Sequence, residues 1–263
     1  MRILTCIKQV PASSKVEVDP VTGVLIRDGN NSKLNPYDLY ALEASFQIKK
    51  QYPRAEIIAI SMGPPSAKAV LEEALYMGAD DGVLVSDRRF AGADVLATSY
   101  TLSQLIKYIG DVDIIVCGKQ TTDGDTAQVG PEIATFLKLP HMPYVTDIID
   151  INNQTIRVKS TYDTHDEINE IHLPCLLTIE KSSLAPRLPS YKRKVSFSNH
   201  TIKTITMEDF IDKDPKHYGL DGSPTQVEEI FPPNKTMASK LIEGSDEDVA
   251  QSLFQILKTN KYV

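Results

Sequence analysis

The 263-residue sequence has little cysteine, few aromatic residues and no long apolar run, and these shortages exclude several classes of protein. It contains no tryptophan and only three cysteines, Cys6, Cys117 and Cys175, each in an apolar run and none in a CxxC pair. This spacing matches neither a zinc or iron–sulfur site nor a disulfide framework, so we expect three buried thiols. HExxH and GxSxG motifs are also absent, and we therefore expect no metal site and no catalytic residues of those kinds.

Basic residues are outnumbered, with 28 Lys and Arg against 35 Asp and Glu and a formal net charge of −7. A protein that grips nucleic-acid phosphates needs a basic surface, so we expect no nucleic-acid partner. No run approaches the roughly 18 apolar residues of a membrane span. The N-terminus also lacks the basic segment and apolar core of a signal peptide. We therefore expect a cytoplasmic protein without a membrane span.

The first half of the sequence alternates short β-type runs with helical patterns, which is typical of a mostly parallel sheet flanked by helices. The predicted strands are residues 2–10, 56–61, 82–86 and 113–117. The predicted helices are residues 36–52, a helix that ends before Gly78, 93–109 and 131–137. Residues 15–28 are predicted to form a hairpin. The fold class is therefore α/β and Rossmann-like.

In the second half, strands are predicted without intervening helices, at residues 144–151, 154–162 and 171–179. We expect them to extend the sheet as antiparallel edge strands. After Glu180 the sequence is irregular and rich in proline, which predicts an arm lying on another surface. A last helix begins at Ser245, with Asp248 completing a capping box and an apolar stripe at Val249, Leu253, Ile256 and Leu257. These patterns divide the chain into two predicted regions, an α/β domain at residues 1–180 and an arm at residues 181–263.

Three loops after predicted strands are suited to a ligand that carries phosphate, because the carboxyl ends of parallel strands share one rim. The loop 118–130 offers glycines, hydroxyls and the first amides of a helix. In it, Asp123 and Asp125 are expected to accept bonds from loop amides or ribose hydroxyls. In the loop 86–94, Arg88 and Arg89 are available to balance a dinucleotide's charge. The loop 62–65 admits a flat ring. Ordinary turn chemistry explains each loop alone, but their common rim favours a nucleotide site.

Seven motifs of the sequence resemble the small, beta subunit of electron transfer flavoproteins, in register from the first strand to the terminal helix. They are CIKQVP at 6–11, DPVT at 19–22, RDG at 27–29, LNPYD at 34–38, MGPP at 62–65, ALYMGAD at 74–80 and the loop 118–130. The resemblance implies a nucleotide-binding domain over 1–180 and a heterodimer with a large alpha subunit. It also implies that residues 181–263 form a partner-recognition loop and an arm whose terminal helix packs on the alpha subunit.

Housekeeping members of that family hold AMP in this subunit, whereas electron-bifurcating members hold a second FAD and bind NADH against it. Residues 86–98, 123–130 and 222–227 resemble the bifurcating kind. The resemblance implies that NADH gives a hydride to this FAD. One electron then passes to the alpha-subunit FAD and a flavin-dependent dehydrogenase of the acyl-CoA, enoyl-CoA reductase-like or lactate type. The other electron passes to ferredoxin or flavodoxin.

Other functions stay open at this stage. The first is a non-bifurcating beta subunit that holds AMP structurally and carries electrons from dehydrogenases. The second is an ATP-dependent ligase or amidotransferase-like enzyme, which would need an SGGxDS-type loop after the first strand, where residues 8–13 read KQVPAS. The third is a purely structural subunit, which the three rim loops make less favoured.

The resemblance implies that the cofactor lies against residues of the rim loops: Cys6, Asn35, Met62, Gly63, Asp94, Thr98, Gly118, Asp123, Gly124, Asp125, Thr126, Ala127, Gln128, Val129 and Gly130. The family's partner loop commonly reads N-E-P-R, and here it reads Leu184-Ala185-Pro186-Arg187. We therefore expect Leu184, Pro186 and Arg187 to contact a partner, with Leu184 as its apolar anchor.

Overall fold

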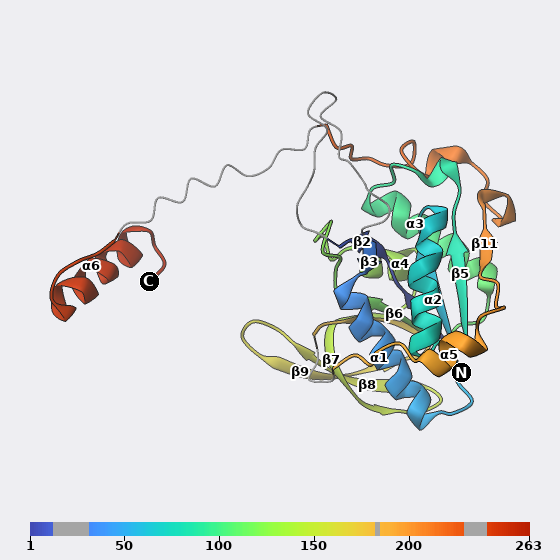
Figure 1. The fold of residues 1–263 in the computed structure, drawn as a ribbon, viewed down its shortest axis with the longest axis horizontal. Coiled ribbons are helices and arrows are strands. Elements are labelled where there is room, and N and C mark those ends of the chain that lie inside the picture. Colours follow the sequence, from blue (N-terminus) through green and yellow to red (C-terminus); the bar gives the residue numbers. More distant parts are fainter. Residues whose placement is uncertain (13–31, 182–184, 229–240) are drawn as a thin grey trace. The chain divides into compact units, whose positions relative to one another are not determined.

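The computed structural model describes residues 1–12, 32–181, 185–228 and 241–263 (Figure 1). The chain forms two compact units, Met1–Glu228 and Glu229–Val263, which are described separately below. The hairpin predicted at residues 15–28 and the predicted anchor Leu184 lie outside the described residues.

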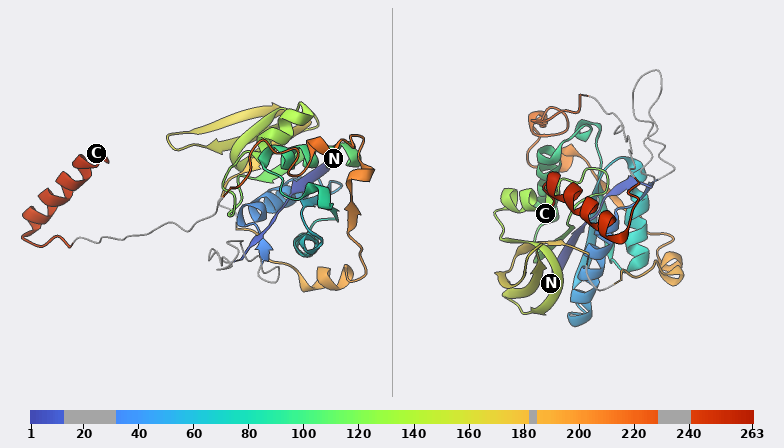
Figure 2. Two further views of the ribbon diagram at one scale, coloured as in Figure 1. Left: turned by 90° about the horizontal axis from the view of Figure 1, so that it is seen from above. Right: turned by 90° about the vertical axis from the view of Figure 1, so that its left-hand side faces the viewer.

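A nine-stranded sheet organises the first unit, in the order β11-β5-β4-β1-β6-β10-β7-β8-β9 (Figure 1). Its parallel strands are β1 (Arg2–Cys6), β4 (Glu56–Met62), β5 (Asp81–Val85), β6 (Ile114–Gly118), β7 (His141–Ile151), β10 (Cys175–Ile179) and β11 (Lys203–Ile205). The antiparallel strands β8 (Thr155–Thr161) and β9 (Asp166–His172) follow β7 at one end, where they form a projecting hairpin (Figure 2). The predicted α/β fold class is confirmed.

Helices cover both faces of this sheet. Alternate strand residues point to opposite sides, and the strands carry apolar side chains on both sides, so each face must be covered. Ile57 and Ala59 of β4 pack with α1 (Pro36–Gln51) and α2 (Lys68–Met77). Ile58 and Ile60 pack in a second core with α3 (Val95–Ile109) and α4 (Val129–Leu137). Burial on two sides explains why the central strands are continuous apolar runs in the sequence.

Two of the predicted strands are wrong in extent. The first strand ends at Cys6, and β2 (Gln9–Pro11) instead pairs antiparallel with β3 (Ser32–Leu34) in a separate two-stranded sheet. The strand predicted at 171–179 is two strands, β9 and β10, separated at Leu173 and Pro174, because proline supplies no amide to a strand ladder. All of β10 is buried, and it pairs parallel with β6 and β7 inside the sheet rather than antiparallel at an edge.

Residues 185–228 belong to the first unit, where they pack on its sheet and helices. After α5 (Tyr191–Ser196), strand β11 adds to the sheet beside β5, and two single 3₁₀ turns follow, η3 (Met207–Asp209) and η4 (Pro215–His217). Arg193 of α5 donates to the carbonyl oxygens of Leu75 and Ala79 at the end of α2, at 2.7 and 2.5 Å. The irregular sequence after Glu180 is therefore held by contacts distant in the chain.

The second unit contains α6 (Asp246–Thr259). Ser245 is its N-cap and forms the predicted capping box with Asp248, in which the Ser245 hydroxyl accepts from the Asp248 amide at 3.3 Å. No residue of α6 is buried, so its apolar stripe has no core of its own.

Candidate functional site

The strand order of the sheet reverses at β1. The chain proceeds from β1 outward to β4 and β5, then crosses to β6 on the other side of β1. In open parallel sheets, ligands bind at such a switch point, in the crevice outside the carboxyl ends of the strands. The segments that meet here follow β1, begin α1 and connect β6 to α4.

Asn35 joins these segments. It occupies the N-cap position of α1 but makes no side-chain capping bond. Its side-chain amide instead donates to the Gln120 carbonyl oxygen at 2.9 Å, and its side-chain oxygen accepts from the Thr122 amide at 3.3 Å. Asn35 therefore fixes the loop after β6 against the start of α1.

Asp38 is a site residue that the sequence analysis missed. Its carboxylate, on a residue only 5% exposed, accepts from the Lys8 amide at 2.7 Å. Burial raises its pKa to about 7, although hydrogen bonds from Asn35, Lys8 and Gly118 act in the opposite direction. In the sequence, an acidic residue in the first turn of a helix indicates only a favourable interaction with the helix dipole.

Two glycines of the loop after β6 allow close packing. A Cβ on Gly118 would lie 2.3 Å from a carboxylate oxygen of Asp38, and a Cβ on Gly130 would lie 2.6 Å from Cγ2 of Thr178. The first glycine lets α1 approach β6, and the second lets α4 approach β10. Both glycines thus determine how closely the two helices approach the strands at the carboxyl edge of the sheet.

The end of this loop presents free backbone donors. Asp125 and Ala127 have left-handed φ angles of 50° and 55°, and Gln128 returns to the right-handed helical region. Alternation of this kind turns successive amides toward one side, which is the geometry of an anion-binding nest. Within the described residues, the amides of Gln128, Val129 and Gly130 make no hydrogen bond, and they begin α4, where the helix dipole favours an anion.

Side chains of the site hold both aspartates of the loop. The Lys8 ammonium lies 2.8 Å from Asp123, and the Gln120 side-chain amide donates to Asp125 at 2.8 Å. Burial raises the pKa of Asp123, but the Lys8 ammonium, the Thr121 hydroxyl and a backbone amide together outweigh burial, and the pKa is lowered overall. The negative charge of Asp123 is therefore balanced locally, which leaves the nest amides available for an anion.

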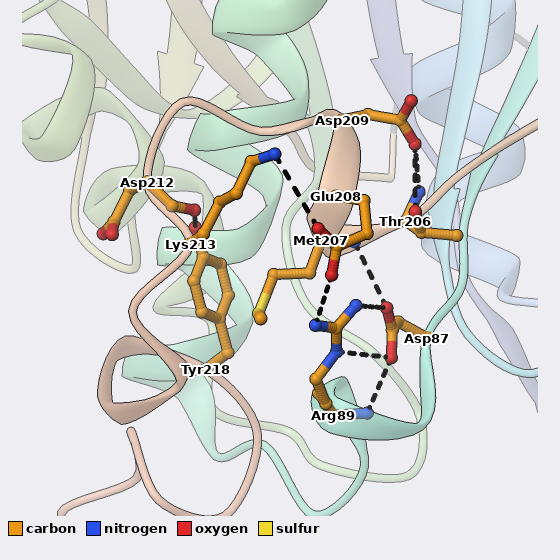
Figure 3. Close-up of polar contacts among 9 residues, drawn as sticks. All are labelled: Asp87, Arg89, Thr206, Met207, Glu208, Asp209, Asp212, Lys213 and Tyr218. Atoms are coloured by element: carbon orange, nitrogen blue, oxygen red, sulfur yellow. Dashed lines mark hydrogen bonds and ion pairs between the residues drawn. The ribbon is translucent and has the colours of Figure 1, made fainter.

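The loop after β5 differs from the sequence expectation at Arg89. Its guanidinium lies between two carboxylates, 2.6 Å from Asp87 and 2.8 Å from Glu208 (Figure 3). The arginine is thus already paired within its own chain, and its part in balancing a dinucleotide's charge stays a prediction. Arg88 is exposed.

Asp94 connects two of the three stretches that resemble electron-bifurcating members of the family, residues 86–98 and 222–227. Its carboxylate caps α3 by accepting from the Ala97 amide at 3.1 Å. The same carboxylate accepts from the amide and hydroxyl of Thr225, at 3.1 and 2.7 Å. The Asp94 amide donates to the Ser223 hydroxyl at 2.8 Å. Residues 222–227 therefore lie on the N-terminus of α3, one turn before the half-buried Thr98.

The loop after β4 lies at the same carboxyl edge. The Gly63 amide donates to the Val85 carbonyl oxygen at 3.1 Å, and Met62 packs against the core beneath α3 and α4. The Ser61 hydroxyl is buried and has no hydrogen-bond partner among the described residues. Cys6 is paired in register with Cys117 on the neighbouring strand, and both are buried as predicted.

Arg187, predicted to contact a partner, is bound by its own chain. Its guanidinium donates twice to the Glu43 carboxylate, at 2.8 and 2.9 Å, and lies 4.3 Å from the centre of the Phe46 ring. The Arg187 side chain is still 43% exposed. Pro186 is half-buried.

Similarity to known proteins identifies the family of the chain. The model of the electron transfer flavoprotein domain matches residues 22–204. The chain belongs to the electron transfer flavoprotein family. Electron transfer flavoproteins are flavin-associated, and their beta subunits, which this chain resembles, pair with an alpha subunit.

Similarity to individual relatives extends over almost the whole chain. The caffeyl-CoA reductase-Etf complex subunit CarD of Acetobacterium woodii is 44% identical over 98% of each chain. The electron transfer flavoprotein subunit beta of Clostridium acetobutylicum is 40% identical over 100% of each. Protein FixA of Azotobacter vinelandii is 39% identical over 94% of this chain and 90% of its own. The resemblance to beta subunits is thereby confirmed.

The residues at the switch point fit an adenine dinucleotide. Free amides at the start of α4 are donors for a diphosphate. The charged side chains of the loop already have partners: Lys119 pairs with Glu180, Asp123 with Lys8, and Asp125 accepts from Gln120. Among the described residues, no helix is long and apolar enough to cross a membrane, and no group of His, Cys, Asp and Glu is arranged to hold a metal ion.

Proposed function

We propose that this chain is the beta subunit of an electron-bifurcating electron transfer flavoprotein and holds FAD at the switch point of its sheet. The observation that carries the proposal is the set of free amides of Gln128, Val129 and Gly130, which form a nest at the N-terminus of α4. Donors in this arrangement bind anions, among them the diphosphate of a dinucleotide.

Each rim loop has a role in this proposal. The nest amides bind the diphosphate, with Gly124, Thr126 and Ala127 shaping the loop around it. Cys6, Asn35, Met62, Gly63 and Gly118 line the adenosine part. The N-terminus of α3, with Asp94 and Thr98, lies on the flavin side. When bound, FAD supplies the chemistry of hydride acceptance and one-electron transfer, while the protein supplies binding and orientation.

Bifurcation is favoured over the AMP-holding alternative by the contact of Asp94 with Ser223 and Thr225. This contact joins two of the stretches that resemble electron-bifurcating members, residues 86–98 and 222–227, at the N-terminus of α3. NADH is the proposed electron donor, and ferredoxin or flavodoxin the proposed low-potential acceptor. The complex is proposed to act in the cytoplasm.

The second proposed acceptor is the alpha-subunit FAD and, through it, a flavin-dependent dehydrogenase. The name of the Acetobacterium woodii relative, a subunit of a caffeyl-CoA reductase-Etf complex, supports a partner of the enoyl-CoA reductase-like or acyl-CoA type. A lactate-type dehydrogenase is the other candidate. Pro186 and Arg187 are proposed to lie at the surface that meets it.

Counting the nucleotides of the purified heterodimer tests the proposal. After denaturation we expect two FAD molecules and no AMP for each heterodimer. One FAD and one AMP would overturn the bifurcating function and favour the housekeeping alternative. A second measurement is NADH-dependent reduction of ferredoxin in the presence of a high-potential acceptor, which we expect only when the acceptor and its dehydrogenase are both present.

A further inference from the structure

The segment Thr206–Thr225, here called the strap, carries Ser223 and Thr225 to Asp94. It contains only two 3₁₀ turns, η3 and η4, so regular backbone hydrogen bonding does not fix its path. Its course therefore depends mainly on side-chain contacts with α3 and with the loop after β5, to which the Leu220 amide adds one backbone bond, at 3.0 Å from the Ala91 carbonyl oxygen. These contacts identify which residues determine where Thr225 lies.

The strap is fixed at its beginning by ion pairs. Glu208 pairs with Arg89 at 2.8 Å, and the Met207 amide donates to Asp87 at 3.3 Å (Figure 3). Both Glu208 and Arg89 are substantially exposed, with side chains 66% and 37% accessible. Exposed ion pairs contribute little to stability, so this attachment alone is weak.

A stronger attachment is formed by Asp212 in the middle of the strap. Its carboxylate accepts a hydrogen bond from the Tyr100 hydroxyl of α3, contacts His217 Nδ1 at 2.6 Å, and accepts from the Asp214 amide at 3.0 Å. Its carbonyl oxygen accepts from the Tyr218 hydroxyl at 2.7 Å. Asp212 therefore ties α3 to both ends of the turn at 214–218.

The aromatic ring of Tyr218 is the apolar part of this attachment. Tyr218 is only 1% exposed, and its ring centre lies 5.4 Å from that of Phe90 and 5.5 Å from that of Tyr100. Gly219 follows with a φ of 54°, and a Cβ there would lie 2.1 Å from the Arg89 carbonyl oxygen. The chain thus turns sharply against the loop after β5, directly before it reaches Asp94.

From these contacts we propose that Asp212 is a positioning residue, which places Ser223 and Thr225 on the N-terminus of α3 and thereby sets the affinity of the flavin side of the crevice. This inference rests on the proposed function for the identity of the ligand, FAD. Asp212 acts through the turn at 214–218 and through Thr225. It need not touch the ligand itself.

Hydrogen exchange of the full heterodimer tests the placement without reference to any ligand. The amides of Leu220, Gly222 and Ser223 donate to Ala91, Tyr218 and Leu220 respectively, and the Thr225 amide donates to Asp94. In Asp212→Ala, we expect these amides to exchange about tenfold faster. Tyr100→Phe, which keeps the ring, should give a smaller increase. Asp221→Asn is the control, because Asp221 is exposed on the same strap.

The affinity for FAD tests the consequence. In heterodimer depleted of its nucleotides, Asp212→Ala should weaken FAD binding about tenfold, and Thr225→Val should do the same without faster exchange at residues 212–218. If Asp212 acts through Thr225, the variant with both substitutions should bind FAD only slightly more weakly than either single variant. Additive effects would overturn the inference, since they would show two unrelated losses of stability.

The possible failures are distinguishable. Unchanged exchange at residues 220–225 in both Asp212→Ala and Tyr100→Phe overturns the inference, whichever nucleotide the protein holds. Faster exchange with unchanged FAD affinity also overturns it. A wild-type heterodimer that retains AMP and takes up no second FAD overturns the proposed function, while the exchange measurement still decides whether Asp212 places the strap.

Discussion

At the scale of single residues, Asp38 links folding to the candidate site most directly. It is buried between the Lys8 amide and Gly118, at the point where α1 meets β6. The loop that begins at Gly118 carries the free amides of Gln128, Val129 and Gly130 at its other end. A change in the charge of Asp38 therefore acts on both the stability of the fold and the geometry of the crevice.

Asp38 should make stability depend on pH near neutrality. Its pKa is raised by burial from 3.8 to about 7, so the folded protein favours the protonated form. The stabilising contribution is complete below pH 3.8 and is lost as pH rises to 7, at about 1.4 kcal/mol per pH unit between these two pKa values. In Asp38→Asn this component of the pH dependence should be absent.

Urea unfolding at pH 5, 6, 7 and 8 measures this difference between wild type and variant. Asp163→Asn, at an exposed turn position, should retain the wild-type dependence. A constant difference in the free energy of unfolding between wild type and Asp38→Asn at every pH would contradict the titration of Asp38.

At the scale of secondary-structure elements, local patterns predicted much of the fold. Helix α3 follows from Asp94 as N-cap and its apolar periodicity, and α6 follows from the capping box of Ser245 and Asp248. The central strands follow from apolar runs long enough to be buried on both faces. In each case, the interactions that determine the element lie within a few residues in the sequence.

Features that depend on distant partners were not predictable in this way. β10 lies inside the sheet because β6 and β7 pair with it, and the three-residue β11 exists only through its pairing with β5. In the sequence, nothing indicates that Arg89 pairs with Glu208, because the two residues are 119 positions apart. Likewise, the contact of Asp94 with Thr225 spans 131 residues, so only the structure shows that residues 222–227 lie at the N-terminus of α3.

The packing of α4 on β10 leads to a prediction for Gly130. In Gly130→Ala, the new methyl group would meet Cγ2 of Thr178 at 2.6 Å, so either α4 or the Thr178 side chain must shift. We expect a loss of roughly 1–3 kcal/mol in the free energy of unfolding, the usual cost of overpacking. Gly124→Ala is the matched control, since its Cβ would meet only the Thr121 hydroxyl at 3.4 Å.

Urea unfolding of both variants measures the two effects. The Gly124 variant should lie within about 0.5 kcal/mol of wild type, as expected for a substitution without a clash. Equal stability of the two variants would mean that the approach of α4 to β10 is not limited by residue 130.

At the scale of the whole molecule, the chain divides into a unit that holds its own core and a unit that does not. Residues 1–228 bury two continuous apolar clusters on the two faces of the sheet. In the second unit, α6 has an amphipathic pattern but no buried residue. A short amphipathic helix is marginally stable without a packing partner, and the family pairs each beta subunit with an alpha subunit. We therefore propose that α6 packs on the alpha subunit.

Charge-matched substitutions on opposite faces of α6 test this proposal. In Leu253→Glu, a carboxylate would enter the apolar stripe, and the affinity of the full-length chain for the alpha subunit should fall by about tenfold or more, which is typical of a buried interface residue. In Gln251→Glu, the same charge is added on the opposite face of the helix, and the affinity should stay within about twofold. Sedimentation velocity over a range of concentrations gives both dissociation constants. Equal weakening by the two substitutions would indicate a general effect of charge, whereas no weakening by Leu253→Glu would remove the apolar stripe of α6 from the interface.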